Sequence, residues 1–391
     1  MHICYITYEY PLWGTGGIGS FVQTIGRALV RKGHKVTVLG IGTKSQTELL
    51  NDQEVEICRL PAPRFFRKGS FAENTWRLRK QLKELHSQSP IDIVETPESL
   101  MFMLPLSSPY AKVIRMHGGH HFFAESENRE VDKWKGFLEK RSFSRADAFV
   151  AVSHYVKNHT AKFLYTGGKP VEIIRYPIDA ELFAQADLSK ALPYRLVFAG
   201  TVCEKKGIRQ LLEALGLLLP RFPELQLDVY GRDWFFPDGR SYTEFLKSSF
   251  PAELLKQVNF HGPVSLQQIP AKYELAELCV FPSHMETQGL VAPEAMLMGK
   301  PVLFSQLGPG PETIKHGVSG LLCDPHSAED IAEKIKFAFE NREEMQAIAL
   351  RGQTEARLMF DMEQILEHNL NYYSSLLKKS ALTERTLIMN L

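Results

Sequence analysis

Two glutamates eight positions apart carry the clearest chemical signal in this chain. Glu286 follows an apolar run and a proline turn, and Glu294 comes after it. Pro293 is typical of a first helical turn, and Gly299 followed by Pro301 is typical of a helix end. We therefore expect Glu286 just ahead of a helix N-terminus and Glu294 about one turn inside that helix.

The residues between these glutamates add a second chemical feature. The first amides of a helix lack intrahelical acceptors, so the N–H groups near Gly289 and Leu290 can hold an anion. A carboxylate repels phosphate but accepts hydrogen bonds from sugar hydroxyls. A site with both features suits a ligand that carries both groups, such as a nucleotide diphosphate sugar.

A glycine-rich loop lies near the N-terminus, between an expected strand and a helix that reaches about Arg31. It contains Gly16, Gly17 and Gly19. Glycines let the backbone approach a ligand closely, and a helix N-terminus attracts anions or polar sugars. The spacing matches neither a dinucleotide fingerprint nor a P-loop. A tight turn used only for packing is the alternative.

A second loop, 200–207, follows an expected strand and precedes a helix. Lys206 stands directly before Gly207, where its ammonium would reach a phosphate-binding corner. Loop lysines are mostly just solvated, so this lysine alone does not define a site.

His117 ends another expected strand, where an imidazole can donate a hydrogen bond to a reacting oxygen. Together, His117, His120 and His121 also suggest a zinc site as an alternative. No cysteine, aspartate or glutamate stands nearby at a familiar ligand spacing, so we expect no metal. A structural histidine remains the alternative.

A basic and aromatic segment follows Pro63. Such a segment can lie on an anionic membrane or bind a lipid diphosphate, and a solvated basic loop explains it equally well. Its residues are Arg64, Phe65, Phe66, Arg67 and Lys68.

Short apolar runs alternate with helix-length segments throughout the chain. Continuously apolar strands are typical of sheets covered on both faces, and this alternation predicts parallel sheets with crossover helices. The expected strands are 3–7, 35–39, 56–59, 91–95, 112–116, 148–151 and 171–174 in the first half, and 194–199, 226–230, 258–261, 278–281, 301–304 and 320–323 in the second.

The length of 391 residues favours two domains. We predict an α/β architecture of two doubly wound, Rossmann-like domains, 1–177 and 178–360. A helix, 361–379, would return to the first domain, and 380–391 would form a tail. Ligands of doubly wound sheets bind beyond the carboxyl ends of the strands. The site is therefore expected in a cleft between the domains.

Composition excludes several classes of function. A net charge of +1 gives no general attraction to nucleic acid. The five cysteines include no C-x-x-C pair, and the N-terminus lacks the pattern of a signal peptide, so we expect a cytoplasmic protein. No Asp-x-Asp metal clamp, G-x-S-x-G elbow or Walker lysine motif occurs.

Taken in order, the motifs resemble family 4 of the retaining glycosyltransferases, which have the two-domain GT-B fold. The likeness spans residues 3–373. It rests on Gly16-Gly17-Ile18-Gly19, Gly33-His34-Lys35-Val36, His117-Gly118, Val152-Ser153, Lys206-Gly207, Phe281-Pro282-Ser283, Glu286, Gly289-Leu290-Val291, Glu294-Ala295-Met296, Gly299-Lys300-Pro301-Val302 and the segment from Gly308 to Glu312.

The resemblance implies transfer of a sugar from a nucleotide donor with net retention and without metal or other cofactor. Glu286 would hold the hydroxyls of the donor sugar, and Glu294 the ribose. Lys206 and the amides from Gly289 to Val291 would stabilise the leaving diphosphate.

In the N-terminal domain, the resemblance has Gly17 to Gly19 approach the sugar and phosphate, and His117 bond the transferred sugar. The acceptor would bind in this domain. Charge that develops on a departing diphosphate requires preorganised donors, here without a metal. We expect the leaving phosphate to take the proton of the acceptor in a front-face attack.

Two positions depart from the family pattern. Thr201 stands where the family often has arginine, so Lys205 is a candidate for the missing diphosphate contact. Gln288 stands where the family often has an aromatic residue, which would alter the pocket or the donor preference.

The expected function is a hexosyltransferase that uses a nucleotide diphosphate donor, with a weak preference for a UDP-sugar. Its acceptor would be a glycan or a lipid-linked sugar in polysaccharide or glycolipid synthesis, with peripheral contact to the inner face of the membrane. Two alternatives remain open: a nucleotide-sugar hydrolase or epimerase of the same fold, and a non-catalytic nucleotide-sugar-binding protein.

Overall fold

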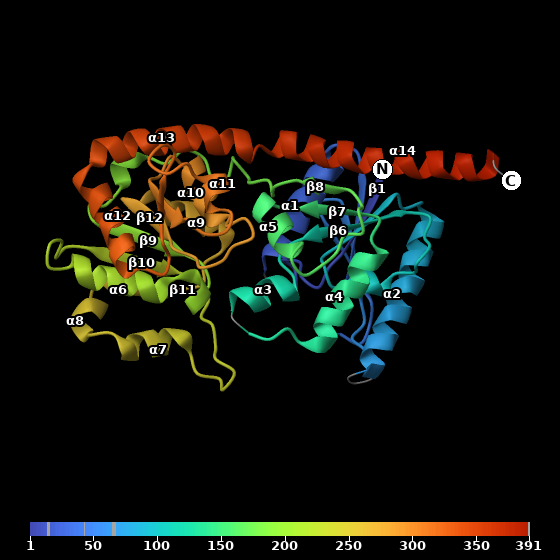
Figure 1. Cartoon of the computed structure of the whole chain (residues 1–391), viewed down its shortest axis with the longest axis horizontal. Helices are drawn as coiled ribbons and strands as arrows, with labels where there is room; N and C mark the ends of the chain where they lie inside the picture. Colours follow the sequence, from blue (N-terminus) through green and yellow to red (C-terminus); the bar gives the residue numbers. More distant parts are fainter. Residues whose placement is uncertain (14–15, 43, 65–67, 128, 390–391) are drawn as a thin grey trace. The chain divides into compact units, whose positions relative to one another are not determined.

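The computed structural model describes residues 1–13, 16–42, 44–64, 68–127 and 129–389. The chain forms two compact units (Figure 1). Unit 1 comprises residues 1–177 and the C-terminal segment that begins at Glu363, and unit 2 comprises Ile178–Met362.

Unit 1 is built on one sheet with the strand order β3-β4-β2-β1-β5-β6-β7-β8. All neighbouring strands are parallel except β3 and β4, which are antiparallel. Its strands are β1 (His2–Ile6), β2 (Lys35–Ile41), β3 (Glu48–Asp52), β4 (Val55–Leu60), β5 (Ile93–Thr96), β6 (Ala111–Met116), β7 (Ala148–Ala151) and β8 (Val171–Ile173). Its helices are α1 (Gly17–Arg31), α2 (Lys68–Gln88), α3 (His120–Ser126), α4 (Lys133–Arg145) and α5 (His154–Thr160), with the 3-10 turn η1 (Met101–Met103).

Unit 2 has a wholly parallel sheet with the order β11-β10-β9-β12-β13-β14. The strands are β9 (Arg195–Ala199), β10 (Gln226–Tyr230), β11 (Val258–Gly262), β12 (Leu278–Phe281), β13 (Val302–Ser305) and β14 (Leu321–Cys323). The helices are α6 (Ile208–Leu218), α7 (Tyr242–Ser249), α8 (Ala252–Leu255), α9 (Ile269–Glu274), α10 (Val291–Leu297), α11 (Gly310–Thr313), α12 (Ala328–Glu340) and α13 (Arg342–Met359). Both units are Rossmann-like, which confirms the predicted fold class.

The sheet of unit 2 is buried on both faces, as its continuously apolar strands predict. In β9, Leu196 and Phe198 point into a core shared with α6 and α12. Val197 and Ala199 point the other way, into a second core shared with α9 and α10. Figure 1 shows these two helical layers on either side of the sheet. The layers leave the carboxyl ends of the strands to the loops.

Strand β3 was absent from the sequence prediction. It forms a hairpin with β4 through a turn at Gln53 and Glu54, whose φ angles are 49° and 70°. Two-residue hairpins of this left-handed kind usually contain glycine, which is missing here. The side-chain oxygen of Asn51 accepts a hydrogen bond from the Glu54 amide at 3.0 Å and so supports the turn. Local side-chain bonding thus replaces the usual sequence signal.

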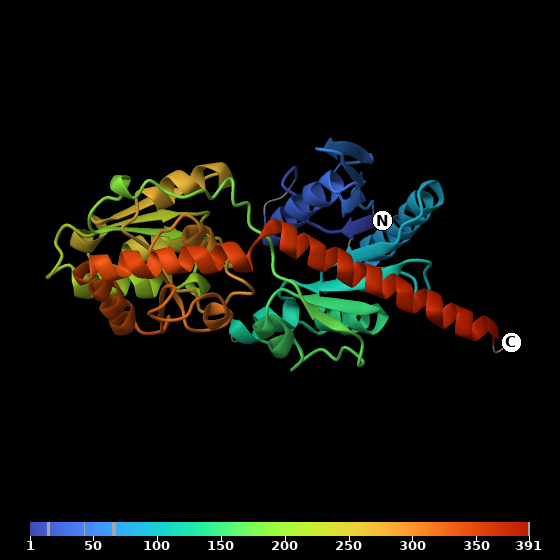
Figure 2. The same ribbon diagram turned by 90° about the horizontal axis from the view of Figure 1, so that it is seen from above.

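Helix α14 (Met362–Met389) lies across the sheet of unit 1 (Figures 1 and 2). The Tyr372 hydroxyl donates to the Phe149 carbonyl of β7 at 3.0 Å, and His368 contacts Glu172 of β8 at 2.9 Å. The helix continues past residue 379 to Met389, where we expected a tail. The sequence 380–389 contains neither glycine nor proline, so nothing in it stops a helix. Within the described ranges, no helix combines the length and apolar character needed to cross a membrane.

Arg115 of β6 is fully buried beneath α14. Its Nε and Nη2 donate to the two carboxylate oxygens of Glu95 at 2.7 and 3.1 Å, and Nη2 also donates to Asn369 Oδ1 at 2.6 Å. The Tyr373 hydroxyl donates to Glu95 as well. A buried charge needs this degree of pairing, because desolvation is costly.

We expect Arg115→Met to destabilise unit 1 by about 3–5 kcal/mol, because Glu95 is left as an unpaired buried charge. Urea unfolding followed by circular dichroism measures the loss. The matched control is Arg221→Met, whose partner is Glu340 on the surface; this change should cost less than about 1 kcal/mol. Equal losses in the two variants would contradict the assignment of Arg115 as a buried structural charge.

Candidate functional site

Two loops of unit 2 meet at the carboxyl ends of β9 and β12. Gly207 has a φ of +71°, and a Cβ atom there would lie 1.8 Å from the Pro282 carbonyl oxygen. Only glycine therefore allows the two loops to pack this closely. The His284 amide donates to the Lys205 carbonyl oxygen at 2.9 Å and ties the loops together.

This packing brings together two of the residues singled out from the sequence. Lys206 Nζ forms an ion pair with Glu286 Oε1. The Ser283 hydroxyl donates to the same carboxylate oxygen at 2.9 Å. The side chains of Lys206 and Glu286 keep 22% and 13% of their exposure, so a ligand can still reach both groups. A cation and a hydroxyl-binding carboxylate thus lie side by side.

Helix α10 follows directly and carries the second glutamate. It begins at Val291, with Leu290 as its N-cap, and Gly289 and the buried Gln288 precede it. Glu294 is the fourth helical residue, as predicted from Pro293. The Ala292 amide donates to the Gly289 carbonyl oxygen at 3.2 Å and Pro293 carries no N–H, so the amides from Gly289 to Val291 are the ones that could meet an anion.

Glu294 is buried, and burial raises its pKa to about 7. The Tyr273 hydroxyl of α9 donates to its Oε2 at 3.5 Å, which partly offsets this rise in pKa. Near neutral pH the side chain is therefore poised between the acid and the carboxylate. Hydroxyl donors from a ligand would favour the carboxylate.

Arg232 is a candidate that the sequence interpretation missed. It stands just after β10, and its Nε lies 3.5 Å from the Thr201 hydroxyl, which follows the neighbouring β9. The Val202 amide donates to the Arg232 carbonyl oxygen at 2.9 Å, which fixes the two loops side by side. The sequence could have indicated Arg232, because Gly231-Arg232 follows its strand in the same way as Gly200-Thr201 follows the adjacent strand.

In unit 1, the glycine loop leads into α1 as predicted, with Gly16 at the N-cap and Gly17 as the first helical residue. A Cβ atom on Gly19 would lie 2.9 Å from the backbone of Glu9 and Tyr10. Gly19 is therefore required for packing of α1 against the loop after β1, whatever else it does.

His117 follows β6 and is buried, with Nδ1 hydrogen-bonded to the Tyr176 hydroxyl. Burial, with a smaller contribution from Arg115, holds its pKa well below the usual value, so the ring is neutral at pH 7. His120 instead accepts from the Asp132 amide, and His121 contacts Glu139. In the described part of the chain, no three histidine, cysteine, aspartate or glutamate side chains gather as metal ligands.

A cavity of about 440 Å³ opens beside Gly118, the residue after His117, at the same sheet edge. Its lining includes Glu9, Ile18, Glu98, Gly118 and Phe71. Glu98 is buried, and burial, with repulsion from nearby Glu139, raises its pKa to about 8. The sequence interpretation missed Glu98, although it follows strand β5 by two residues.

Arg64 begins the basic and aromatic segment, and its amide donates to Glu73 Oε2 at 2.7 Å. Phe65, Phe66 and Arg67 lie outside the described residues, as does the side chain of Lys68.

Comparisons with known proteins agree with this architecture. Residues 15–182 match the family model "Glycosyltransferase Family 4", and residues 181–354 match "Glycosyl transferases group 1". The glycogen synthase of Mycobacterium tuberculosis is 24% identical over 407 residues, which span 95% of this chain and 94% of that protein. The D-inositol 3-phosphate glycosyltransferase of Pseudarthrobacter chlorophenolicus is 30% identical over 241 residues, 58% of this chain and 54% of that protein.

Solved structures show the same fold. Sucrose-phosphate synthase from Thermosynechococcus elongatus superposes with a TM-score of 0.83 at 22% identity and covers 97% of this chain and 99% of its own. HepE of Anabaena, crystallised with UDP, superposes with a TM-score of 0.77 at 19% identity and covers 96% and 100%.

The two Rossmann-like units show the GT-B fold, and the matched family models and the similar proteins show that this protein is a glycosyltransferase. The two matched family models narrow the class further. The chain belongs to glycosyltransferase family 4, which confirms the resemblance found in the sequence.

The raised pKa of Glu294 predicts a specific pH dependence of stability. The folded-state pKa of about 7 lies above the ordinary value of 4.5, so the folded chain binds this proton more tightly than the unfolded chain. This stabilising contribution is complete below the ordinary pKa and is lost as pH rises through 7. Wild type should therefore weaken relative to Glu294→Gln by up to about 1.4 kcal/mol per pH unit between about pH 4.5 and 7, and the difference should level off above about pH 7. Urea midpoints from pH 5.5 to 8.5 measure the difference, and a constant difference would contradict the shift.

Proposed function

We propose that this protein is a retaining, metal-independent hexosyltransferase that uses a nucleotide diphosphate sugar. The observation that carries the proposal is the contact between Lys206 and Glu286 ahead of the amide end of α10. We assign Glu286 to the hydroxyls of the donor sugar and Glu294 to the ribose. Lys206 and the amides from Gly289 to Val291 serve the diphosphate.

The electrostatics of this arrangement support departure of a diphosphate. Loss of the leaving group develops negative charge, and fixed N–H donors with an ammonium stabilise that charge without reorganising. In the unliganded chain, Lys206 is balanced by Glu286. A bound diphosphate would compete for the ammonium and release the carboxylate to accept from sugar hydroxyls.

For the chemical step we propose front-face attack. The acceptor oxygen bonds to the anomeric carbon as the bond to the diphosphate breaks, and the proton of the acceptor passes to the leaving phosphate oxygen. His117 would bond a hydroxyl of the transferred sugar. Retention of configuration follows, because attack and departure occur on one face.

The acceptor is proposed to bind unit 1, in the cavity that contains Glu98 and Phe71. Carboxyl groups accept from sugar hydroxyls, and aromatic side chains pack against apolar sugar faces. This lining supports a glycan or a lipid-linked sugar as acceptor, in polysaccharide or glycolipid synthesis. Cytoplasmic action and peripheral membrane contact through the segment from Arg64 to Lys68 remain part of the proposal.

Donor turnover tests the central assignment. HepE of Anabaena was crystallised with UDP-glucose, so we begin a panel of UDP-, GDP- and ADP-sugars with that compound. We expect release of the nucleoside diphosphate to be unaffected by EDTA, and to fall about 10²–10³-fold in Glu286→Gln, because sugar-positioning bonds act in the transition state. Proton NMR of the first product should show the anomeric configuration of the donor. Loss of activity with EDTA, an inverted product, or full turnover in Glu286→Gln would each refute part of the proposal.

Arg232 is proposed to supply the cation that Thr201 lacks. Arg232→Ala should weaken UDP binding about 5- to 20-fold, as expected for loss of one charge-assisted contact to phosphate. Isothermal titration calorimetry measures this affinity. Arg240→Ala is the matched control, because Arg240 is exposed in the same unit and paired with Asp238. Equal affinities for the two variants would remove Arg232 from the site.

A further inference from the structure

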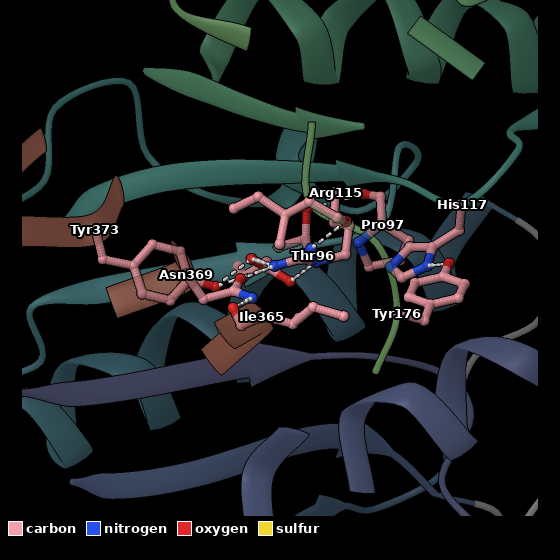
Figure 3. A network of polar contacts seen from close by, with 10 residues as sticks. Thr96, Pro97, Arg115, His117, Tyr176, Ile365, Asn369 and Tyr373 are labelled. Atoms are coloured by element: carbon pink, nitrogen blue, oxygen red, sulfur yellow. Dashed lines mark hydrogen bonds and ion pairs between the residues drawn. The ribbon is translucent and has the colours of Figure 1, made fainter. Parts of the chain in front are cut away.

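The imidazole of His117 is held by the phenol of Tyr176 (Figure 3). The Tyr176 hydroxyl bonds Nδ1, and the two rings stack with centroids 5.6 Å apart and 22° between their planes. Within the described part of the chain, Tyr176 is the one side chain that hydrogen-bonds this imidazole. The other ring nitrogen, Nε2, is the one that the proposed contact with the sugar would use.

Both partners of this hydrogen bond are uncharged. Burial lowers the pKa of His117 and raises that of Tyr176. A neutral phenol and a neutral imidazole can form this hydrogen bond in two directions, with either the phenol O–H or the ring Nδ1–H as the donor. A phenol is the stronger acid and an imidazole nitrogen the stronger base, so the O–H···N arrangement is favoured. The single proton of the ring then resides on Nε2.

We propose that Tyr176 is a positioning residue for His117: its hydroxyl donates to Nδ1 and keeps the ring proton on Nε2, where it can be donated to an oxygen of the transferred sugar. This inference rests on the proposed contact between His117 and the sugar. The other tautomer would present a lone pair at Nε2 and could only accept a hydrogen bond.

The structure also shows what holds Tyr176. Phe21 of α1 packs against its ring at 4.8 Å, and the Arg115 guanidinium lies 4.6 Å from the centre of Phe21. Arg115 Nη1 also donates to the carbonyl of Ile174, two residues before Tyr176, at 3.5 Å. Arg115 thus contacts both Phe21, which packs against Tyr176, and the backbone two residues before Tyr176.

Helix α14 completes this support from the far end of the chain. Figure 3 shows Arg115 between Asn369 and Tyr373 on one side and His117 with Tyr176 on the other. Asn369 accepts from Arg115, and Tyr373 donates to Glu95, the ion-pair partner of Arg115. We infer that α14 acts on His117 through Arg115 and Tyr176, without touching the imidazole.

The tautomer can be measured directly in the full chain by ¹⁵N NMR with imidazole-labelled histidine, and His117→Gln assigns the signals. In wild type we expect an unprotonated Nδ1 and a protonated Nε2. Tyr176→Phe keeps the ring and removes the donor, so both nitrogens should move toward averaged shifts. An Nδ1–H tautomer in wild type, or unchanged shifts in Tyr176→Phe, would overturn the proposal; the wild-type measurement needs no variant to fold.

Kinetics supply a second readout. Tyr176→Phe should lower kcat about tenfold and leave the donor KM within about twofold, since one hydrogen bond that matters in the transition state is lost. A donor KM that rises while kcat stays unchanged would contradict the positioning role. If His117→Gln keeps wild-type turnover while the tautomer result holds, the proposed contact between His117 and the sugar fails and the Tyr176 assignment survives.

Two adjacent tyrosines of α14 provide a matched pair. Tyr373 bonds Glu95 inside the network, whereas Tyr372 bonds the Phe149 carbonyl outside it. Tyr373→Phe should move the His117 signals in the same direction as Tyr176→Phe, by a smaller amount. Tyr372→Phe should leave them unchanged. Identical effects from the two changes would show that α14 acts only by general stabilisation, and would refute its link to His117.

Discussion

The close contact between two loops of unit 2 is the constraint on which the donor side depends. Gly207 lies against the Pro282 carbonyl at a distance that excludes any side chain. That contact places Lys206 beside Glu286, and the chain then turns directly into α10. Without it, the two loops that carry the ammonium and the carboxylate would not be held together. Together with the amides that lead into α10, they form the surface that we propose binds a diphosphate and a sugar at once.

Burial sets the charge of the polar groups at both sheet edges. It keeps His117 neutral, brings the pKa of Glu294 to about 7 and raises that of Glu98 to about 8. Arg115 is equally buried but stays charged, because Glu95 pairs with it. The fold thus pairs the buried charge of Arg115 within a structural network, whereas Glu98 and Glu294, near the carboxyl ends of strands, can change protonation.

Much of the fold could be predicted from the sequence, because the strands of a covered parallel sheet are continuously apolar and ligands bind beyond their carboxyl ends. Apolar runs located the strands, and residues after a strand, such as His117 and Lys206, lie at the carboxyl ends of the strands as expected. The β3–β4 hairpin was missed because Gln53 and Glu54 adopt left-handed φ without glycine. Glu98 and Arg232 obeyed the same edge rule, but no motif drew attention to them. The Tyr176–His117 contact joins residues 59 positions apart, which no local pattern encodes.

The C-terminal helix shows that residues far apart in the sequence can support the same candidate site. Helix α14 leaves unit 2 at Met362 and is packed on unit 1 from Glu363 onward. His368 and Tyr372 bond to β8 and β7, whereas Asn369 and Tyr373 converge on Arg115 and Glu95, two residues before His117 and three before Glu98. A helix needed only to cover apolar strands would gain nothing from burying these polar groups, since hydrophobic residues of similar volume would serve at least as well. The buried network instead fixes one register of α14 on the sheet, and with it the position of the strand ends that carry the candidate residues of unit 1.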